Sequence, residues 1–585
     1  MDVKFQDTQA NTTTELNSSK QPSHSKPSET FSIAEAVVKI LEDMGVQYAF
    51  GVSGGAIAPL WQALQHSSIK VLHFRHEAGA AFAAVEAYFA SDRPVVVFTT
   101  IGPGITNALT GLFAARWEGA KVIFLSPSTS ASQRGRWAFQ ETSTYTMPSG
   151  GLFTSEPLFH YATTLECSDE LSKVHRRLAL GIARPDGFVA HLNISTNIQT
   201  SSVKTSLPRV AFSFAPAAVN EETIAECTRL LSEGPFAIWV GFGARGAAAE
   251  ICQLAEATGA AVMCSPRGKG IFPENHPQFV GVTGFAGHTS VLTYMQEQRP
   301  LRVLVLGTRL SEWTSFWNSV MIPKRGFVHV DIDPEVPGTA YPSAETFAIQ
   351  SDVGMFVKAL LKYFPQHPNQ LTEMLLPCSK PVIFNLRAEG LVRPEVLMDA
   401  IQRQIVEGTD AVVMAEGGNS LAWAINLLRF AKPGRFRAST RFASMGHFVT
   451  GVVGASLARN GKTVAIVGDG AMLMNNEIST AVRYQVAAVW IVLNDGRYSM
   501  CDQGMALLGF KDVDVEIPQA DFVKIASGMG AEGIRVETEP EIQAALEKAM
   551  ASTCPYVVDV VIDPTRLAPI KSHIHNLIAQ GTTNY

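Results

Sequence analysis

The chain has 585 residues, 46% hydrophobic and 17% charged, so it can bury large cores and is not a mainly disordered protein. Its 47 basic and 53 acidic residues leave a net charge of −6, which argues against the strong positive field that nucleic-acid binding needs. Seven scattered cysteines without a CxxC pair favour reduced thiols in a cytoplasmic protein over a disulfide framework or a zinc ribbon.

The first 30 residues are polar and rich in Ser, Thr, Asn and Gln, and we expect a disordered tail rather than a signal peptide. Order is expected from Phe31, because Ser32 and Glu35 have the spacing of a capping box ahead of an apolar helical stripe. No later stretch reaches about 18 uninterrupted apolar residues, which argues against a membrane-spanning helix.

Short apolar runs alternate with helical segments along the rest of the chain, and a glycine-containing turn follows most of them. The predicted strands lie at 46–52, 95–100, 122–125, 236–240, 303–306, 328–332, 412–415, 464–467 and 489–493. This order predicts an α/β protein of doubly wound, mostly parallel sheets with helices on both faces. Ligand-binding loops are then expected at the carboxyl ends of the strands.

Two polar, proline-containing stretches, 199–218 and 364–394, are typical of linkers. They divide the ordered chain into three parts of normal domain size. The predicted organisation is a disordered tail at 1–30, a first domain at 31–198, a central domain at 219–364, a third domain at 385–565 and a C-terminal tail at 566–585.

Two strand ends in the third domain carry acidic residues that suit a metal–phosphate site. Gly468-Asp469-Gly470 follows one predicted strand and Asn494-Asp495-Gly496 follows the next, with one helix expected between them, from 475 to about 485. As one βαβ unit, they place both aspartates at the same crevice. Magnesium held by carboxylates and ligand phosphates fits this pattern, and two ordinary strand-end turns are the alternative.

Glu77 is the second candidate for chemistry. It heads a predicted helix of small apolar residues at 78–84, where a carboxylate has few polar neighbours. A desolvated acid of this kind suits proton transfer at neutral pH. The alternative is an acid in the first turn of a helix, which the helix dipole favours.

Taken in chain order, these motifs resemble the large catalytic subunit of acetolactate synthase, a thiamine diphosphate-dependent family. Gly468-Asp469-Gly470 followed by Asn494-Asp495 resembles the family's thiamine diphosphate motif. The other matching segments are Arg75-His76-Glu77, Gly102-Pro103-Gly104, Asn107, 138–141, 268–270, 272–276 and 329–334. The resemblance extends over about residues 31–565.

The resemblance implies a pyrimidine-binding first domain and a diphosphate-binding third domain that meet between the chains of a homodimer or homotetramer. Glu77 matches the glutamate that hydrogen-bonds the pyrimidine ring, Gln140 a glutamine of the active site, and Met445 the apolar residue that keeps the cofactor bent. Magnesium would be bound by Asp469, by Asp495 where the family usually has Asn, and by the backbone carbonyl of Arg497. The implied cofactor-binding residues are Gly54, Gly55, Glu77, Gly417, Asn419, Ser420, Met445, Gly468, Gly470 and Ala471.

Several positions depart from the acetolactate synthase pattern. The stretch 154–160 lacks the family's lysine, Gly504 stands where a tryptophan narrows the acceptor pocket, and Ile101 replaces a small polar residue. We expect a wider and more apolar pocket, similar to that of the acyloin-forming enzymes of scytonemin biosynthesis. The alternative is that an insertion near 147–151 or the C-terminal tail fills the space.

The resemblance leaves FAD open. Gly241-Phe242-Gly243 and the segment 331–333 resemble the flavin-site region of the family, whereas 284–287 and 309–312 depart from it. Relatives often keep such a central domain without flavin.

We therefore expect an enzyme that uses thiamine diphosphate and Mg2+ to decarboxylate a small-molecule 2-oxo acid and to join the remainder to a second carbonyl compound. Bulky or aromatic substrates are favoured over pyruvate. An acetolactate synthase acting on pyruvate and a simple 2-oxo acid decarboxylase are the alternatives. A non-catalytic relative is disfavoured, because it would be expected to lack Glu77 or Asp469, and both are present.

Overall fold

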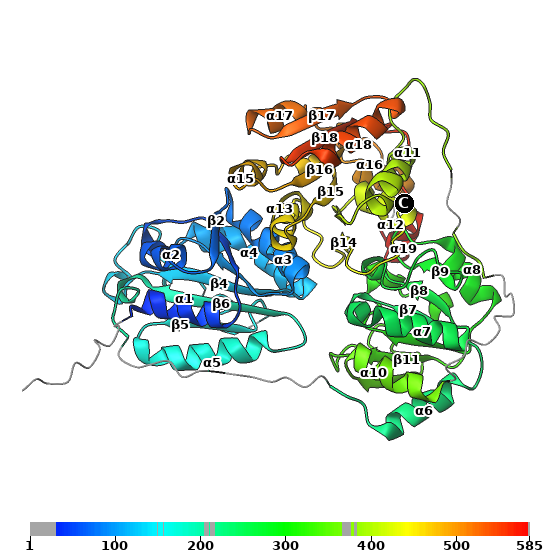
Figure 1. The fold of residues 1–585 in the computed structure, drawn as a ribbon, viewed down its shortest axis with the longest axis horizontal. Coiled ribbons are helices and arrows are strands. Elements are labelled where there is room, and N and C mark those ends of the chain that lie inside the picture. Colours follow the sequence, from blue (N-terminus) through cyan, green and yellow to red (C-terminus); the bar gives the residue numbers. More distant parts are fainter. Residues whose placement is uncertain are drawn as a thin grey trace, which may run out of the picture.

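A computed structural model describes residues 31–582 apart from 149, 156, 204–209, 211–216, 365–375 and 380–382. Three parallel sheets of six strands each form the protein (Figure 1). The predicted disordered tail and much of both predicted linkers lie outside the described residues. Among the described helices, none combines the length and apolar character that a membrane crossing requires.

The first sheet has the strand order β2-β1-β3-β4-β6-β5, and all of its strand pairs are parallel. Its strands are β1 (Tyr48–Gly51), β2 (Lys70–His73), β3 (Val95–Phe98), β4 (Lys121–Ser128), β5 (Tyr161–Leu165) and β6 (Phe188–Ser195). Its helices are α1 (Ile33–Asp43), α2 (Ala58–Gln65), α3 (Glu77–Ser91), α4 (Pro103–Glu118) and α5 (Leu171–Ile182). The predicted capping box of Ser32 and Glu35 is present at the start of α1.

Alternate residues of β3 belong to different apolar cores. Val96 and Phe98 pack in the core that contains α1, whereas Val95 and Val97 pack in the core that contains α3 and α4. Because successive strand side chains point to opposite faces, helices bury both sides of the sheet. This explains why the sequence shows continuous apolar runs, and the predicted doubly wound fold is confirmed.

The third sheet repeats the strand order of the first, as β14-β13-β15-β16-β18-β17, again with all pairs parallel. Its strands are β13 (Val412–Ala415), β14 (Phe436–Ala438), β15 (Thr463–Gly468), β16 (Ala488–Asn494), β17 (Glu532–Val536) and β18 (Tyr556–Val561). Its helices are α11 (Pro394–Ile401), α12 (Asn419–Leu427), α13 (His447–Arg459), α14 (Asp469–Met472), α15 (Ile478–Arg483), α16 (Ser499–Leu507), α17 (Phe522–Gly528), α18 (Ile542–Ala551) and α19 (Lys571–Ala579).

Two elements of this region differ from the sequence-based expectation. The helix expected at 475–485 is shorter, because Asn475 and Asn476 precede α15 as a turn, the conformation that asparagine favours. The predicted C-terminal tail contains α19, which packs back onto the protein.

The central sheet has the order β12-β11-β10-β7-β8-β9 and is also parallel. Its strands are β7 (Phe236–Val240), β8 (Ala261–Cys264), β9 (Phe279–Val282), β10 (Arg302–Leu306), β11 (Phe327–Asp331) and β12 (Thr346–Gln350). Its helices are α6 (Glu221–Leu231), α7 (Ala248–Thr258), α8 (Thr289–Glu297), α9 (Glu312–Ser315) and α10 (Val353–Leu360).

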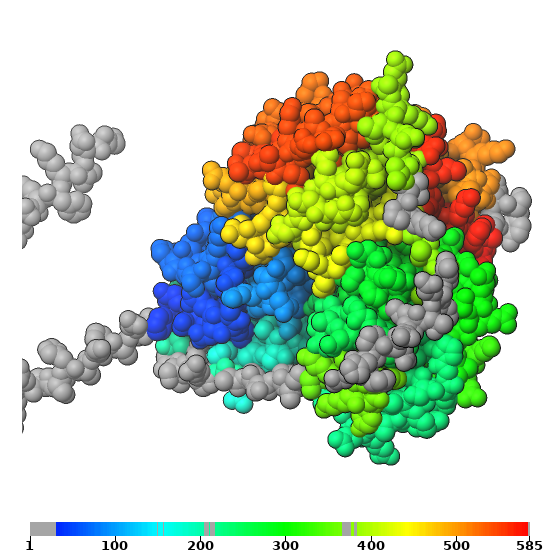
Figure 2. All heavy atoms as spheres, turned by 45° about the vertical axis from the view of Figure 1, so that its right-hand side comes forward, coloured from blue at the N-terminus to red at the C-terminus, as the bar shows by residue number. Residues whose placement is uncertain are grey.

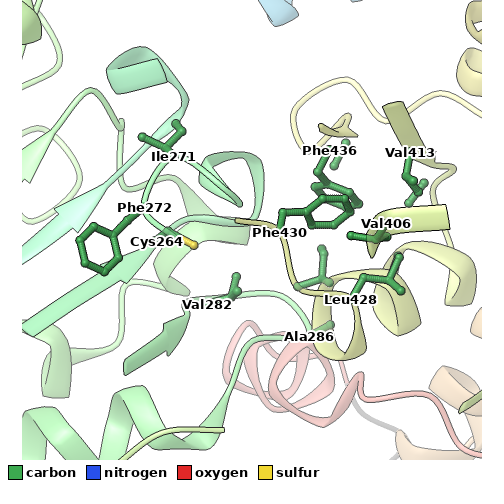
Figure 3. Close-up of a cluster of buried hydrophobic side chains, with 14 of the residues drawn as sticks. Cys264, Ile271, Phe272, Val282, Ala286, Val406, Val413, Leu428, Phe430 and Phe436 are labelled. Carbon is green, nitrogen blue, oxygen red and sulfur yellow. The ribbon is translucent and has the colours of Figure 1, made fainter. Parts of the chain in front are cut away.

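The three regions pack against one another, with the segment after β13 lying between the first and central regions (Figure 2). One apolar cluster continues from the central region into the third, and Figure 3 shows Ile271 and Phe272 on one side and Phe430 and Phe436 on the other. Such shared burial fixes the relative placement of the central and third regions. The exact domain boundaries remain a prediction.

Candidate active site

The predicted cofactor residues gather at the point where the strand order reverses in the first and third sheets. Gly54 and Gly55 follow β1, 417–420 follows β13, and 468–471 follows β15. In each sheet these strands flank the reversal, where the outgoing loops separate and leave a crevice at the carboxyl edge.

The loop after β13 has the features of a diphosphate cradle. Gly418 has φ +113°, a conformation that side chains disfavour, and α12 begins at the next residue. The hydroxyl of Ser420 donates a hydrogen bond to the carbonyl oxygen of Glu416 at 2.9 Å. The side-chain oxygen of Asn419 is buried and has no hydrogen-bond partner among the described residues. A helix N-terminus beside an unpaired polar atom fits an anionic ligand.

Asp469 lies at the end of β15 with its carboxylate held by backbone donors. Its Oδ1 accepts a hydrogen bond from the N–H of Gly470 at 2.8 Å, and its Oδ2 accepts from Gly496 at 2.7 Å and from Asp495 at 3.2 Å. The predicted meeting of the two strand ends is therefore observed, and the carboxylate has a fixed orientation.

Asp495 lies in the same buried crevice. Burial raises the pKa of Asp495 to about 6, and the adjacent charge of Asp469 adds to the rise. Burial also raises the pKa of Asp469. The hydroxyl of Ser499 donates to the Asp495 carboxylate. One buried and one half-buried carboxylate that affect each other's charge leave negative charge that a divalent cation would offset, so the residues present fit Mg2+.

The neighbouring glycines leave room for a ligand on one side only. A β-carbon at Gly468 would meet open space, whereas one at Gly470 would stand 2.6 Å from the ring of Tyr498. The guanidinium of Arg497 pairs with Asp502 at 3.2 Å. Its side chain is thus directed to another partner, as expected for a residue assigned a role through its backbone carbonyl.

Met445 precedes α13 and is 41% exposed. The following residue, Gly446, has φ +86° and lies against Met474, so that a β-carbon there would stand 2.7 Å from the Met474 sulfur. The start of α13 is held by Glu416, whose Oε2 accepts hydrogen bonds from Phe448 N–H at 2.7 Å and Val449 N–H at 3.2 Å. Sequence reasoning missed this role of Glu416, although the residue stands directly before the Gly417-Gly418 turn.

The first domain brings its own candidates together. The side-chain nitrogen of Asn107 donates a hydrogen bond to Oε2 of Glu77 at 3.1 Å, and Glu77 is 7% exposed. Gln140 lies beside the Gly102 turn, where an added β-carbon would stand 3.1 Å from the Gln140 side chain. Gln140 itself has φ +51°, an unusual backbone conformation for this residue type that is often found at functional loops.

Helices α3 and α13 join the first and third domains and run antiparallel. Gly454 lies against Ala83, where an added β-carbon would stand 2.0 Å from the Ala83 carbonyl oxygen. Gly451 lies against Glu86 in the same way, with 2.7 Å from its added β-carbon to Cγ. The residue numbers of the contacting pairs rise along α3 and fall along α13. The N-terminal ends of the two helices therefore lie at opposite ends of the contact.

This arrangement separates the two halves of the predicted site within one chain. Glu77 begins α3, and Met445 lies two residues before α13, which has 13 residues. At a rise of 1.5 Å per residue, about 20 Å separates them along the helix axis. In the described part of the chain, no hydrogen bond or ion pair joins Glu77 or Gln140 to the loops that contain Asp469 and Asn419.

Gly504 does not face open space. An added β-carbon at this position would stand 3.5 Å from Cδ1 of Ile574, which lies on α19 and is 4% exposed. The adjacent Gln503 donates to the carbonyl of Arg566 at 3.0 Å and accepts from the N–H of Ala568 at 3.0 Å. The C-terminal segment therefore borders the position of Gly504, a contact that supports the alternative in which the C-terminal tail fills the space there.

The turn after β7 in the central region is closely packed. Gly241 lies against Thr308, and an added β-carbon would stand 2.2 Å from the Thr308 Cβ. The ring of Phe242 lies under the guanidinium groups of Arg267 at 4.4 Å and Arg245 at 4.7 Å. Protein side chains thus fill the region next to the turn that resembles a flavin site.

One other group of potential metal ligands occurs among the described residues: Cys252, Glu256 and His276. The N–H of Gln278 donates to Nδ1 of His276 at 3.2 Å, so the neutral ring keeps its proton on Nε2. That proton faces the carboxylate of Glu256 at 3.5 Å.

Two sheets of identical strand order, with glycine turns at their reversal points and aspartates at neighbouring strand ends, define an α/β protein with ligand-binding loops at the carboxyl edges of its sheets. Three models of the thiamine pyrophosphate enzyme family match this chain. The model of the N-terminal TPP-binding domain matches residues 31–147, that of the central domain matches 227–360, and that of the C-terminal TPP-binding domain matches 416–560. The chain belongs to this family.

The similar curated proteins point to the acetolactate synthase branch. The chain is 27% identical to a probable acetolactate synthase large subunit of Methanocaldococcus jannaschii, with 92% of this chain and 93% of that protein covered. It is also 27% identical to the acetolactate synthase isozyme 1 large subunit of Escherichia coli, with 95% and 97% covered. An acetolactate synthase of Mycobacterium bovis gives 27% identity, with 94% and 90% covered. The protein is thus an acetolactate synthase-like, thiamine diphosphate-dependent enzyme.

Proposed function

We propose that this enzyme decarboxylates a 2-oxo acid and ligates the remaining unit to a second carbonyl compound. The observation that carries the proposal is the pair of buried Asp469 and half-buried Asp495, together with the unpaired Asn419 oxygen at the same carboxyl edge of the third sheet. These groups suit a magnesium ion and a diphosphate, and Met445 borders the same loops.

Thiamine diphosphate, when bound, supplies a nucleophilic carbon and accepts the electron pair left by departing carbon dioxide. The chain's own residues bind and orient it. Asp469, Asp495 and the carbonyl of Arg497 would hold the metal, and 417–420 would hold the diphosphate. Glu77, fixed by Asn107, would hydrogen-bond the pyrimidine ring and hold a proton there. Gln140 would line the substrate side.

We propose a homodimer as the smallest active form. The separation of about 20 Å between Glu77 and Met445 along α13 keeps one chain from completing the site. A second copy would supply Glu77 to the Asp469 side, and twofold symmetry would produce two equal sites. A homotetramer would contain the same pair.

Two substrate classes have specific observations in their favour. Gly504 and Ile101 favour bulky or aromatic 2-oxo acids, as in acyloin formation. The contact of Ile574 with Gly504 favours a narrower pocket and hence an acetolactate synthase acting on pyruvate. We propose the bulky class, with Ile574 as the side chain that limits substrate size.

The test offers pyruvate, phenylpyruvate, 4-hydroxyphenylpyruvate and indolepyruvate, singly and in pairs, to the purified protein with thiamine diphosphate and Mg2+. Mass spectrometry identifies the products, and Glu77→Gln is the control. Coupled aromatic products absent from the control support the proposal. Acetolactate from pyruvate alone would support the narrower class, and free aldehyde without coupling would mean a decarboxylase.

Two further expectations stay predictions. The contacts of Phe242 favour a protein without bound FAD, which the visible absorbance of the purified enzyme tests. The cytoplasmic location rests on cysteine usage in the sequence.

A further inference from the structure

Glu477 lies in the third domain, on the segment between the two metal-binding strand ends, yet its carboxylate contacts the first domain. Its Oε1 accepts hydrogen bonds from the backbone N–H groups of Arg75 and His76, both at 3.1 Å. These two residues immediately precede Glu77. The carboxylate therefore acts as a cap, supplied by another domain, for the helix that begins with Glu77.

The surrounding contacts make this an extended docking site. The hydroxyl of Tyr484 accepts a hydrogen bond from the N–H of His73 at 2.8 Å, and Arg75 Nε donates to the hydroxyl of Ser479 at 2.9 Å. The segment 477–484 thus fixes the backbone from the end of β2 to the start of α3.

Close packing leaves Glu477 no alternative position. Its side chain lies against Gly79, where an added β-carbon would stand 2.7 Å from Oε1. Glu477 is 1% exposed, and the hydroxyl of Thr480 donates to its Oε2. A glutamine has one acceptor oxygen where the carboxylate has two. Its amide N–H2 group would therefore face either the backbone N–H groups of the first domain or the Thr480 hydroxyl, and one set of hydrogen bonds would be lost.

We propose that Glu477 is a positioning residue that sets the orientation of Glu77 toward the cofactor. The inference rests on the proposed function, in which Glu77 hydrogen-bonds the pyrimidine ring. Two backbone hydrogen bonds fix the residues before Glu77, Asn107 fixes its carboxylate, and together they leave Glu77 one orientation. A small displacement of a proton-transfer group is enough to slow its reaction strongly.

The experiment measures exchange of the thiazolium C2 proton of bound thiamine diphosphate in heavy water, by quenched NMR, in the full-length holoenzyme with Mg2+. In Glu477→Gln we expect exchange about 10- to 100-fold slower than in the wild type, with cofactor affinity within about threefold. Glu477→Asp keeps a carboxylate and is expected to show an intermediate rate.

Glu539→Gln is the matched control. Glu539 is also buried, and its carboxylate accepts hydrogen bonds from the backbone of Arg387 at 2.7 Å and from the side chain of Arg393 at 2.6 Å, far from α3 in sequence. This variant is expected to lower the melting temperature and leave the exchange rate unchanged. If Glu477→Gln does not fold, Thr480→Val, which removes one donor to Glu477, gives the deciding measurement, and a slower exchange is expected.

The outcomes separate this inference from the proposed function. Failure of the wild type to bind thiamine diphosphate, or normal exchange in Glu77→Gln, would overturn the proposed function. A different result would overturn only the positioning role of Glu477. In that case C2-proton exchange would be slow in Glu77→Gln but at the wild-type rate in a folded Glu477 variant or in folded Thr480→Val.

Discussion

The two aspartates of the proposed metal site differ in how the protein holds them. The carboxylate of Asp469 accepts hydrogen bonds from three backbone N–H groups, whereas the Asp495 carboxylate is held by the hydroxyl of Ser499. A preorganised ligand loses little freedom on binding a cation, so Asp469 is the stronger contributor. Asp495 adds a second negative charge at this edge of the sheet.

Asp469→Asn is therefore expected to weaken magnesium-dependent binding of thiamine diphosphate by about 100-fold, because it removes a charged ligand and sets an amide against backbone donors. Asp495→Asn keeps an oxygen ligand, and the affinity is expected to stay within about threefold of the wild type. Titration of intrinsic fluorescence at several Mg2+ concentrations measures both. Equal losses in the two variants would contradict the distinction.

The meeting of the two acidic strand ends was predictable because its signal is local. Asp469 stands between two glycines and Asp495 stands before Gly496, each after a buried apolar strand, and parallel strands present such ends at one edge. Glu416 and Glu477 gave no comparable signal, because their partners lie 32 and 402 residues away along the chain. A sequence pattern can indicate the turn in which such a residue lies. Its hydrogen-bond partner becomes visible only when the distant segments pack together in the structure.

Among the elements, α19 is the one that we expect to influence substrate choice. It packs Ile574 against Gly504, while Asn576 and Gln580 donate to Glu312 of α9 at 2.6 and 2.8 Å. The helix thus connects the wall that α16 forms to the central region. The sequence analysis left open whether the C-terminal tail or an insertion fills the space beside Gly504, because no periodic signal shows where a terminal helix docks.

Ile574→Ala is expected to raise the ratio of kcat/KM for phenylpyruvate to that for pyruvate by about 10-fold or more, because three side-chain carbons leave the wall. Leu567→Ala is the matched control, since Leu567 lies on the same segment but is 61% exposed. Steady-state kinetics with both substrates measure the ratio. An unchanged ratio would show that α19 does not border the substrate.

The contact of α3 with α13 contains a buried ionic group. Both side-chain oxygens of Glu86 accept hydrogen bonds from Arg437 at 2.8 Å, and Oε1 also lies 2.9 Å from Nε2 of His447. Glu86→Gln leaves the Arg437 charge unpaired in the interior, and we expect a loss of about 3–5 kcal/mol in the free energy of unfolding. Urea denaturation measures this value.

The same group implies sensitivity to acid. Burial alone would raise the pKa of Glu86, but Arg437 and His447 outweigh it and lower the pKa to about 2. A carboxyl whose pKa is lower in the folded state stabilises the protein above its ordinary pKa and loses that contribution as the pH falls toward 2. The wild type should therefore lose more stability than Glu86→Gln between about pH 4.5 and 2, which urea denaturation at each pH tests.

At the scale of the whole molecule, the sequence was sufficient for the fold class. Continuous Val- and Ile-rich runs indicate strands that are buried on both faces, and the glycine turns after them indicate the carboxyl edges of the sheets. It did not show that the first and third sheets share one strand order, because strand pairing depends on distant contacts. It also did not show that α3 and α13 cross antiparallel, which places Glu77 remote from Met445 in the same chain.

That remoteness leads to a direct test of the shared site. Glu77→Gln and Asp469→Asn should each inactivate the enzyme when expressed alone, because every site then lacks one half. Coexpressed chains that assemble at random would form about half heterodimers. If each site combines the first domain of one chain with the third domain of the other, one site of each heterodimer is intact.

The coexpressed mixture should then recover about a quarter of the wild-type activity, and heterodimers isolated with two different tags should recover about half. A double variant carrying both changes on one chain, coexpressed with the wild-type chain, is the control. In its heterodimer each site has one defect, so only the wild-type homodimers contribute. The opposite result would be no activity in the mixture of the two single variants and one fully active site per heterodimer in the control. It would place Glu77 and Asp469 of the same chain in one site.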